Sequence, residues 1–419
     1  MQMKKIVVSM FAAGIMASPL AYATNGYFSH GFGIKSKGMA GVGIAMGQDS
    51  LAAATNPAGM VLVGDRIDLG VDLFRPTRGA EVSGNICGPG CSLDGTYDGN
   101  NTSIFAIPEF GYNKMMNPNM SLGVSVYGNG GMNTDYKSSP FAAFPNATSP
   151  AGVNLSQLFI APTWAMKLNP SNSVGVSLNL AYQSFEAKGL EPFAGMSSDS
   201  TKLTNNGADT STGYGVRLGW IGEVTPMITL GATYQTKTKM GKFSKYAGLF
   251  AEQGGFDIPA TYGVGVTMNA TPETTVAFDI QQIDYGDVKS IANTNAAGGP
   301  LGADNGAGFG WKNMTVYKLG VSHAYSTDFM LRAGLSTNSQ QIDASQTFFN
   351  ILAPGVVQNH LTLGATWTLQ NKSELSVGYM HAFEKTINGS GSIAPGSGGG
   401  EANIKMYQDS LGVAYSWKL

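Results

Sequence analysis

The chain has 419 residues and a formal net charge of −2, and only 12% of its residues are charged, about half the share in an ordinary soluble domain. This charge gives no basis for binding nucleic acid, and beyond the first 23 residues no apolar run approaches the roughly 18 residues that a transmembrane helix needs. Because only helices and closed β-barrels pair every backbone group inside a bilayer, a low-charge chain with 43% hydrophobic residues and no such helix is predicted to be an outer-membrane β-barrel.

The first residues of the chain have the features of an export signal. Lys4 and Lys5 precede an apolar stretch at residues 6–16, and Ala21-Tyr22-Ala23 is a small-residue cleavage site of the A-x-A type. We therefore expect residues 1–23 to be a signal peptide, and not a buried helix or strand, so that the mature chain begins at Thr24.

Residues 24–64 separate this signal from the first predicted strand. They lack strand alternation and are rich in glycine and alanine, and residues 48–55 have the pattern of a short helix that Asp49 or Ser50 caps and Asn56-Pro57 ends. A barrel as wide as the one predicted below cannot be filled by wall side chains alone. We interpret this segment as a plug in the lumen, with a disordered periplasmic tail as the alternative.

The only cysteines, Cys87 and Cys91, lie in the first long connection between predicted strands. An exported chain meets an oxidising compartment, which favours a local disulfide that closes the tip of this loop. The alternative is a pair of free thiols, since no nearby histidine completes a metal site.

An alternation of polarity with a period of two residues marks the barrel strands, as in outer-membrane barrels generally. In the last strand, Leu411, Val413, Tyr415, Trp417 and Leu419 share one face, and small or polar residues occupy the other. Counting such segments predicts an all-β fold, a fourteen-stranded antiparallel barrel within residues 65–419. The predicted strands are 66–75, 103–113, 120–128, 155–168, 173–187, 213–224, 227–239, 258–270, 274–286, 314–325, 328–338, 356–369, 373–384 and 404–418.

The connections between these strands alternate strictly between short and long. The short ones are residues 114–119, 169–172, 225–226, 271–273, 326–327 and 370–372. Short periplasmic turns and long extracellular loops are typical of outer-membrane barrels, and an even strand number places both chain ends in the periplasm. A soluble sandwich also alternates in polarity, but it gives no reason for this alternation of loop length.

Several motifs resemble the FadL family of outer-membrane transporters of hydrophobic compounds, over nearly the whole mature chain. The most specific is GIKSKGMAGVGIA at residues 33–45, continued by DSLAAATNPAGM at 49–60, which is similar to the N-terminal hatch of that family with its Asn-Pro-Ala signature. Supporting matches are VYGNGG at 126–131, FAG at 193–195 and RAG at 332–334. The resemblance implies a fourteen-stranded barrel plugged by residues 24–64.

The resemblance also implies a route for the substrate. It lands on hydrophobic extracellular loops, enters the barrel, and leaves sideways through a gap beside a kinked third strand when the hatch shifts. The candidate gating residues of the hatch are Asn56, Pro57, Ala58 and Gly59, and those of the gap are Gly128, Asn129, Gly130 and Gly131, where small residues weaken strand pairing. We expect Asn56-Pro57-Ala58 to lie against the wall at this gap.

Residues 240–255 have the features of a landing surface, because their apolar residues follow helical spacing and lysines surround them. The alternative is a loop helix that packs on a neighbouring loop. The candidate extracellular groove comprises Phe185, Leu190, Phe193, Phe243, Tyr246, Leu249 and Phe250.

Three cations are candidates for an inner binding site. Alternation turns Arg217, Lys318 and Arg332 into the lumen, where each could bind a substrate carboxylate or pair with a carboxylate of the protein. The fatty-acid transporters of the family carry an arginine immediately before the Phe-Ala-Gly match, whereas this chain has Pro192. Long-chain fatty acids remain the expected substrates, with neutral aromatic or aliphatic hydrocarbons as the alternative.

We therefore expect a multi-pass protein of the bacterial outer membrane that admits hydrophobic small molecules by ligand-gated passive diffusion. We expect no enzymatic activity, cofactor or metal, because the four histidines show neither metal-binding spacing nor a serine motif of a phospholipase. A general porin is the rival, but it would need an open lumen instead of a plug. The expected surroundings are outer-membrane lipid and lipopolysaccharide, with the protein as a monomer.

Overall fold

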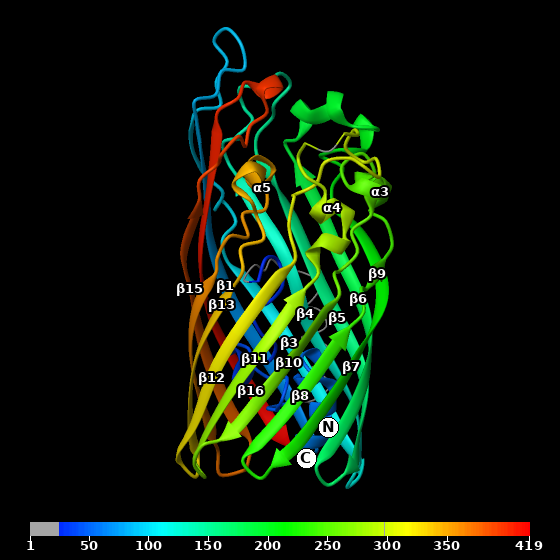
Figure 1. Ribbon diagram of the computed structural model, residues 1–419, viewed down its shortest axis with the longest axis vertical. Helices are drawn as coiled ribbons and strands as arrows, with labels where there is room; N and C mark the ends of the chain where they lie inside the picture. Colours follow the sequence, from blue (N-terminus) through cyan, green and yellow to red (C-terminus); the bar gives the residue numbers. More distant parts are fainter. Residues whose placement is uncertain (1–24, 297) are drawn as a thin grey trace.

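The computed structural model describes residues 25–296 and 298–419, so the expected signal peptide and Thr24 lie outside the described residues. Fourteen long antiparallel strands close into a barrel, because β1 (Arg66–Ser83) pairs with β16 (Glu401–Lys418) on one side and with β3 (Phe105–Asn117) on the other (Figure 1). Two short strands are additions to this wall: β2 (Gly95–Asp98) pairs with the end of β1, and β9 (Lys239–Met240) pairs with β7. The predicted closed barrel of fourteen strands is confirmed.

Each remaining predicted strand overlaps one observed strand. These are β4 (Met120–Tyr136), β5 (Ala151–Asn169), β6 (Asn172–Lys188), β7 (Asp209–Thr225), β8 (Ile228–Gln235), β10 (Thr261–Asn269), β11 (Thr274–Ile283), β12 (Met314–Ser326), β13 (Phe329–Asn338), β14 (Asn359–Thr368) and β15 (Glu374–Ile387). The largest differences are in β1 and β4, which continue well past the predicted residues 75 and 128. Pairing with β16 and β5 extends them where the polarity pattern is already lost.

The helices of the described residues are all short. They are α2 (Ile34–Lys37), η1 (Ala52–Ala54), η2 (Pro57–Leu62), η3 (Glu191–Met196), η4 (Ser200–Lys202), η5 (Ser244–Tyr246), α3 (Ala251–Gly254), η6 (Tyr285–Asp287), α4 (Lys289–Ala292), η7 (Ala344–Gln346), α5 (Thr347–Asn350) and η8 (Pro395–Ser397). In the part of the chain that the structure describes, no helix has the length and apolar character to cross a membrane.

Neither the short helix expected at residues 48–55 nor the alternative of a loop helix at residues 240–255 is observed. Residues 48–55 contain only the 3-10 turn η1, because the Asp49 carboxylate accepts a hydrogen bond from Leu51 N and closes a tight turn instead. Residues 240–255 contain η5 and α3 but no continuous helix, since Glu252 and Gln253 have φ angles of 59° and 55°. Packing on the neighbouring loops therefore overrides the helical spacing.

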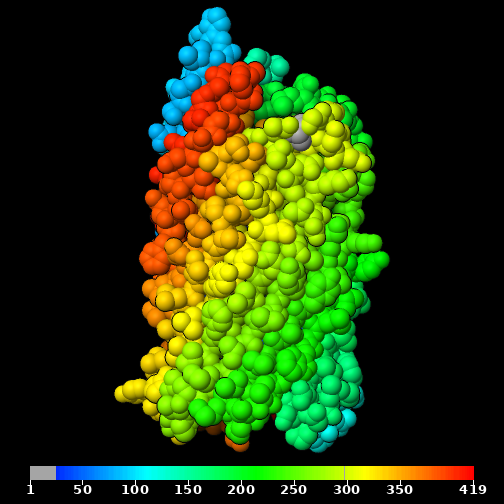
Figure 2. All heavy atoms as spheres, in the orientation of Figure 1, coloured from blue at the N-terminus to red at the C-terminus, as the bar shows by residue number. Residues whose placement is uncertain are grey.

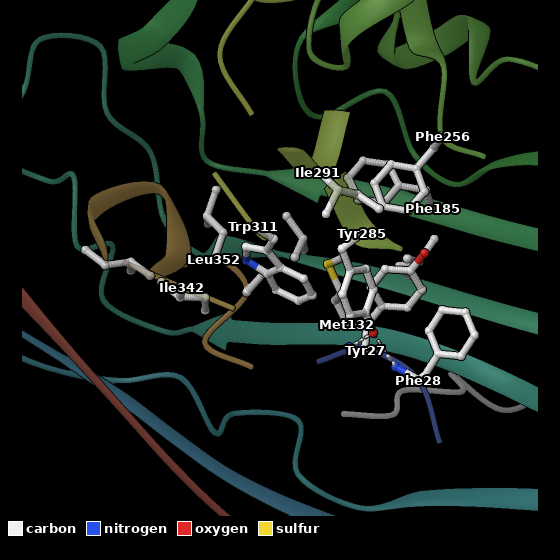
Figure 3. Packing of buried hydrophobic residues seen from close by; sticks show 14 of the residues in the cluster. Tyr27, Phe28, Met132, Phe185, Phe256, Tyr285, Ile291, Trp311, Ile342 and Leu352 are labelled. Carbon is white, nitrogen blue, oxygen red and sulfur yellow. Dashed lines mark hydrogen bonds between the residues drawn. The ribbon is translucent and has the colours of Figure 1, made fainter. Parts of the chain in front are cut away.

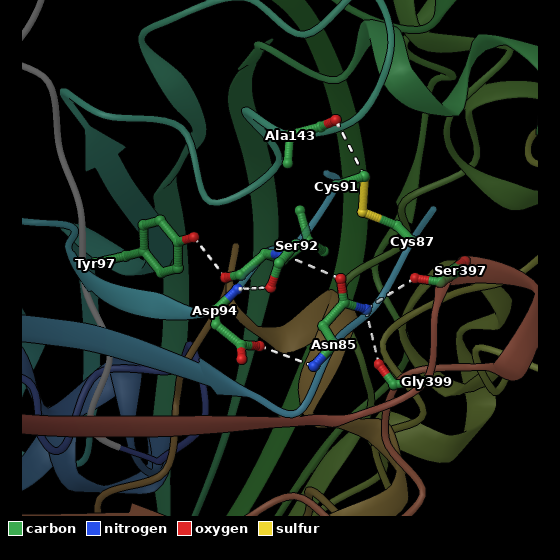
Figure 4. Close-up of a disulfide and its surroundings, with 10 residues drawn as sticks. Asn85, Cys87, Cys91, Ser92, Asp94, Tyr97, Ala143, Ser397 and Gly399 are labelled. Atoms are coloured by element: carbon green, nitrogen blue, oxygen red, sulfur yellow. Dashed lines mark hydrogen bonds between the residues drawn. A yellow bond between two sulfur atoms is a disulfide. The ribbon is translucent and has the colours of Figure 1, made fainter. Parts of the chain in front are cut away.

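The two ends of the barrel differ, as the alternating connections predict. The short turns and the C-terminus lie at one end, and the long loops fill the other (Figure 1). At the loop end, Cys87 and Cys91 form a disulfide in the hairpin between β1 and β2, which rises above the neighbouring loops (Figure 2). The Asn85 side-chain amide in this hairpin donates hydrogen bonds to the carbonyl oxygens of Ser397 and Gly399. These bonds connect the disulfide-closed hairpin to the loop between β15 and β16 (Figure 4).

The faces of the wall follow the predicted alternation. In β16, Leu411, Val413 and Trp417 are exposed on the outer surface, whereas Ser410 and Ser416 are buried on the inner one. An apolar outer band and a polar interior are typical of a barrel surrounded by lipid.

Candidate functional site

Residues 25–64, here called the N-terminal segment, are held by charged groups on the inner wall. The Lys37 ammonium lies 2.6 Å from the Asp72 carboxylate of β1, and both side chains are almost completely buried. Lys35 forms a second ion pair with Glu374 of β15. Breaking a buried ion pair leaves an uncompensated charge and is costly, so these contacts fix the segment against two neighbouring regions of the wall.

Wall carboxylates also accept hydrogen bonds from the backbone of the segment. Glu109 of β3 accepts from Gly33 N at 3.2 Å and Ile34 N at 3.0 Å. Asp279 of β11 accepts from Gly43 N at 2.8 Å and from the following amide at 3.1 Å. Because β3 and β11 are far apart around the barrel, the segment spans its interior (Figure 1).

Glycines on the inner face of the wall let the backbone of this segment approach closely. A Cβ atom added at Gly334 would lie 2.5 Å from Ala40 N, and one added at Gly320 would lie 2.7 Å from Met39 O. Further wall glycines in similar contact are Gly111, Gly123, Gly175, Gly219, Gly231, Gly265, Gly364, Gly378 and Gly412. This belt accounts for part of the high glycine content, 57 residues in all, which sequence reasoning left unexplained. Glycine recurring on the lumen-facing positions of successive strands was the signal that could have revealed it.

The Asn-Pro-Ala motif does not lie where we expected. The Asn56 side-chain amide donates to Trp220 O at 3.0 Å and Ala232 O at 3.2 Å, and its oxygen accepts from Ala58 N at 3.1 Å. Pro57 instead lies against Gly175 and Gly219, so the motif faces β6 to β8. The prediction that the motif lies at Gly128–Gly131 was wrong. The turn at Asn56 and Pro57 packs against wall glycines, and Gly175 of β6 and Gly219 of β7 provide them.

The wall is broken at the run Gly128–Gly131. Pairing of β4 with β3 ends at Val126 and Phe110, although both strands continue, and pairing of β4 with β5 is shifted between Gly128 and Gly130. A continued register would have placed Pro108 opposite Gly128, but the described residues form no such pair. The wall break is therefore an unpaired stretch between β3 and β4.

The first residues of the N-terminal segment cover this wall break. Ser29 N donates to Asn129 O, and Gly131 N donates to Tyr27 O, both at 2.9 Å. The Asn129 side chain turns inward and donates to Gln157 of β5. A short stretch of the segment thus replaces β3 as a neighbour of β4.

A small apolar pocket with a free volume of about 50 Å³ lies among the long loops. Five residues of the predicted groove line it: Phe185, Leu190, Phe193, Leu249 and Phe250. The other two, Phe243 and Tyr246, are buried behind it, with ring centres 5.6 and 4.9 Å from that of Phe185. Sequence reasoning missed the remaining lining residues, which are Phe141, Val153, Leu203, Ser290, Leu301, Ala307, Gly308, Phe309, Phe349 and Leu352. Their signal was the presence of large apolar residues in long loops.

Two of the three candidate cations, Arg217 and Lys318, line one small inner cavity with a free volume of about 20 Å³. Arg217 donates to Thr55 O at 3.0 Å and to the Gln235 side chain, and Lys318 donates to His30 O at 3.0 Å. Among the described residues neither has a carboxylate within ion-pair distance, since Asp279 is turned toward the segment. The expectation that protein carboxylates neutralise them was wrong for these cations.

Arg332 is also buried, but it does not line this cavity. Its guanidinium donates to Thr366 Oγ1 at 2.7 Å. Within the described residues it forms no ion pair either. Arg217 and Lys318 therefore differ from Arg332 in lining this small cavity together with apolar side chains of the N-terminal segment, such as Phe28 and Phe32.

Burial also changes the titration of the segment itself. Burial and the nearby Asp68 carboxylate raise the pKa of Asp49 to about 6. Burial lowers the pKa of His30, whose ring stacks on that of His360 at 5.5 Å. Removing water from these two groups disfavours their charged forms.

The sequence profile of outer membrane protein transport proteins (OMPP1/FadL/TodX) matches residues 20–403. The toluene transporter TodX of P. putida superposes with a TM-score of 0.70 at 18% identity, over 93% of this chain and 99% of that one. A FadL homologue of Pseudomonas aeruginosa gives 0.71 at 16% identity, over 94% and 99%. The toluene transporter TbuX of Ralstonia pickettii gives 0.66 at 18%, over 92% and 98%. At these identities the likeness establishes a shared fold, and no curated protein matches the sequence.

Proposed function

Because this chain belongs to the outer membrane protein transport family (OMPP1/FadL/TodX), whose members carry hydrophobic compounds, we propose that it takes up long-chain fatty acids by ligand-gated passive diffusion. In this proposal residues 1–23 are the signal peptide, residues 24–64 the hatch and residues 65–419 the barrel. The protein acts as a monomer in the lipid and lipopolysaccharide of the outer membrane.

The observation that carries the choice of substrate is the pairing of an apolar loop pocket with a cavity that holds two buried cations. An acyl chain gains about 0.8 kcal/mol for each methylene removed from water, so the loop pocket suits its tail. A carboxylate is costly to bury unless a cation receives it, and Arg217 and Lys318 have no carboxylate partner among the described residues. An amphipathic acid satisfies both sites.

The route out of the barrel is proposed to be lateral. The glycine belt and the wall carboxylates hold most of the N-terminal segment tightly, which opposes passage straight through it. The wall break at Gly128–Gly131 needs no strand pairing to be broken between β3 and β4. We assign Asn56, Pro57, Ala58 and Gly59 to anchoring the hatch on β6 to β8 while the substrate leaves through the break.

Neutral hydrocarbons are the second candidate substrates. TodX and TbuX are described as toluene transporters, and the hydrogen bonds of Arg217 and Lys318 to backbone carbonyls already satisfy part of their donor capacity. Pro192, which precedes the Phe-Ala-Gly match, also favours a substrate without a carboxylate. A general porin is less well supported, because the segment packs closely against the inner wall.

Substituting the cations separates the two substrate classes. Cells that carry Arg217→Met with Lys318→Met should take up labelled palmitate at least about tenfold more slowly than wild type, because charge-assisted hydrogen bonds are lost, while toluene uptake stays unchanged. Arg332→Met is the matched control, since it removes a buried cation outside the cavity. Equal palmitate uptake by the double variant and the Arg332→Met control contradicts carboxylate recognition. If the wild type takes up toluene but not palmitate, neutral hydrocarbons are the favoured substrates.

Closing the wall break tests the lateral route. Pro108→Cys and Gly128→Cys would place thiols opposite each other in a continued register, where a short bifunctional maleimide can join β3 to β4. Cross-linking should abolish uptake of either substrate, and each single cysteine variant treated with the reagent is the control. Full uptake by the cross-linked barrel would exclude exit through the break.

A further inference from the structure

Residues 25–29, here called the tip, form a separately held part of the N-terminal segment. The tip is a tight turn in which Asn25 N donates to Phe28 O at 3.1 Å and Phe28 N donates to Asn25 O at 3.2 Å. Gly26 in this turn has a φ of 66°, a conformation that glycine adopts without strain. The two backbone hydrogen bonds to β4 described above then place the tip across the wall break.

One tyrosine side chain from an extracellular loop holds the tip from the other side. The Tyr285 hydroxyl accepts hydrogen bonds from Tyr27 N at 3.2 Å and Phe28 N at 3.3 Å, and it donates to Asn25 O at 2.5 Å. A hydroxyl offers one donor and two acceptor sites, so the tip uses all three. The Tyr285 ring also packs on Tyr27 and Phe28, with centres 5.2 and 5.8 Å apart (Figure 3).

The same loop lines the apolar pocket. Tyr285 begins η6, which leads into α4, and Ser290 of α4 lies in the pocket wall. Trp311 near the end of this loop packs edge-on against the Tyr285 ring at 5.1 Å. A substrate that displaces the loop therefore acts directly on the residue that holds the tip.

Aromatic rings fill the space between the pocket and the tip. Phe250 in the pocket wall contacts Phe256 at 4.8 Å, and Phe256 contacts Tyr27 of the tip at 6.1 Å. Aromatic side chains thus connect the pocket with the tip, and they occupy the space between them (Figure 3). A substrate can follow it only if some of these rings move.

We propose that Tyr285 is the positioning residue that keeps the tip closed over the wall break, and that substrate reaches the break when the tip leaves this hydroxyl. The contacts of the tip described here join uncharged groups, whereas residues 33–44 are held by ion pairs and wall carboxylates. Neutral hydrogen bonds are the weaker of the two, so the tip opens while the rest of the segment stays in place. This role in transport rests on the proposed function.

The substitution Tyr285→Phe tests the proposal, because it keeps the ring and removes all three hydrogen bonds. The backbone amides of Tyr27, Phe28 and Gly131 should exchange with deuterium at least about tenfold faster than in the wild type. The maximal rate of palmitate or toluene uptake should rise, while the concentration for half-maximal uptake stays within about twofold, since the pocket is unchanged. Tyr317→Phe is the matched control, as that side chain lies on the outer surface of β12.

The outcomes separate the role of Tyr285 from the proposed function. Unchanged amide exchange in Tyr285→Phe overturns its positioning role, whatever the uptake. Faster exchange with unchanged uptake shows that the tip is not the gate and overturns the proposal. If the wild type carries neither compound while the tip amides still respond, the proposed function fails and Tyr285 keeps only its role of holding the tip.

Discussion

The ion pair between Lys37 and Asp72 should control how readily the N-terminal segment detaches from the wall. The two charged atoms are 2.6 Å apart, and the side chains are only 10% and 5% exposed. Removing one partner of a buried pair costs about 3–5 kcal/mol, because the other charge stays buried without compensation. We expect Asp72→Asn to lie at the lower end, since the Glu109 carboxylate also acts on Lys37.

A loss of about 3 kcal/mol corresponds to a factor of roughly 150 in the equilibrium for local opening. Hydrogen exchange of a peptide covering residues 34–42, measured on the folded barrel in detergent, reports this equilibrium directly. The barrel itself should stay closed, which its unchanged mobility on an unheated gel would verify.

The double variant Lys37→Met with Asp72→Leu is the control that isolates the charge. Replacing both members of a buried pair by apolar residues of similar size is often neutral, so its exchange should stay near that of the wild type. A hydrogen-exchange rate in Asp72→Asn within about threefold of the wild-type rate would refute the reasoning. A double variant whose segment exchanges as fast as that of Asp72→Asn would refute it too.

Three further predictions concern the belt, the loop pocket and the segment. Gly334→Ala should expose residues 30–64 to limited proteolysis, because its Cβ would lie 2.5 Å from a backbone nitrogen of the segment, whereas Gly195→Ala has open space and should not. Phe250→Ala should weaken binding of a fluorescent fatty acid by roughly tenfold or more, for about 50–100 Å² of lost apolar contact, and Phe383→Ala on the outer wall should leave it unchanged. Asp49→Asn should slow hydrogen exchange of the N-terminal segment by roughly tenfold at pH 7.5 and change it little at pH 4. The folded pKa of Asp49, about 6, lies above the unfolded value, so its buried negative charge destabilises docking of the segment as the pH rises between the two values. Equal effects at both pH values would contradict this assignment.

Most of the barrel could be predicted from sequence because its wall obeys a local rule. Residues such as Leu411 and Ser410 alternate between lipid and lumen, and turn residues separate the strands, so each strand is recognisable by itself. The extension of β1 was missed because Pro76 and the buried Arg78 interrupt the alternation. The two Nη atoms of Arg78 donate to Pro76 O and Thr102 O, in a setting that only the folded loops create.

The interior could be predicted only in part, because its contacts join residues far apart in the chain. The inward direction of Arg217 and Lys318 followed from alternation. That neither forms an ion pair among the described residues depends on the hydrogen bonds of Asp279 to the N-terminal segment. Tyr285 and its partners in the tip are separated by more than 250 residues, and nothing near Tyr285 in the sequence indicates that its hydroxyl binds three backbone groups. Contacts of this kind follow from the path of the segment through the barrel.

The N-terminal segment is held by strong contacts along most of its length and by weaker ones at the tip, and this difference fits the proposed passive transport. Moving the whole segment would break two buried ion pairs and expose the glycine belt, at a cost of several kcal/mol for each unpaired charge. Releasing the tip breaks hydrogen bonds that contribute about 0.5–1.5 kcal/mol each, and an apolar substrate in the same space replaces the lost ring contacts. Moving the whole segment would break the contacts of the tip as well as the ion pairs, so releasing the tip alone is the less costly movement. In the proposed lateral route, the wall break lies beside the tip, so this smaller movement is the one that would uncover it.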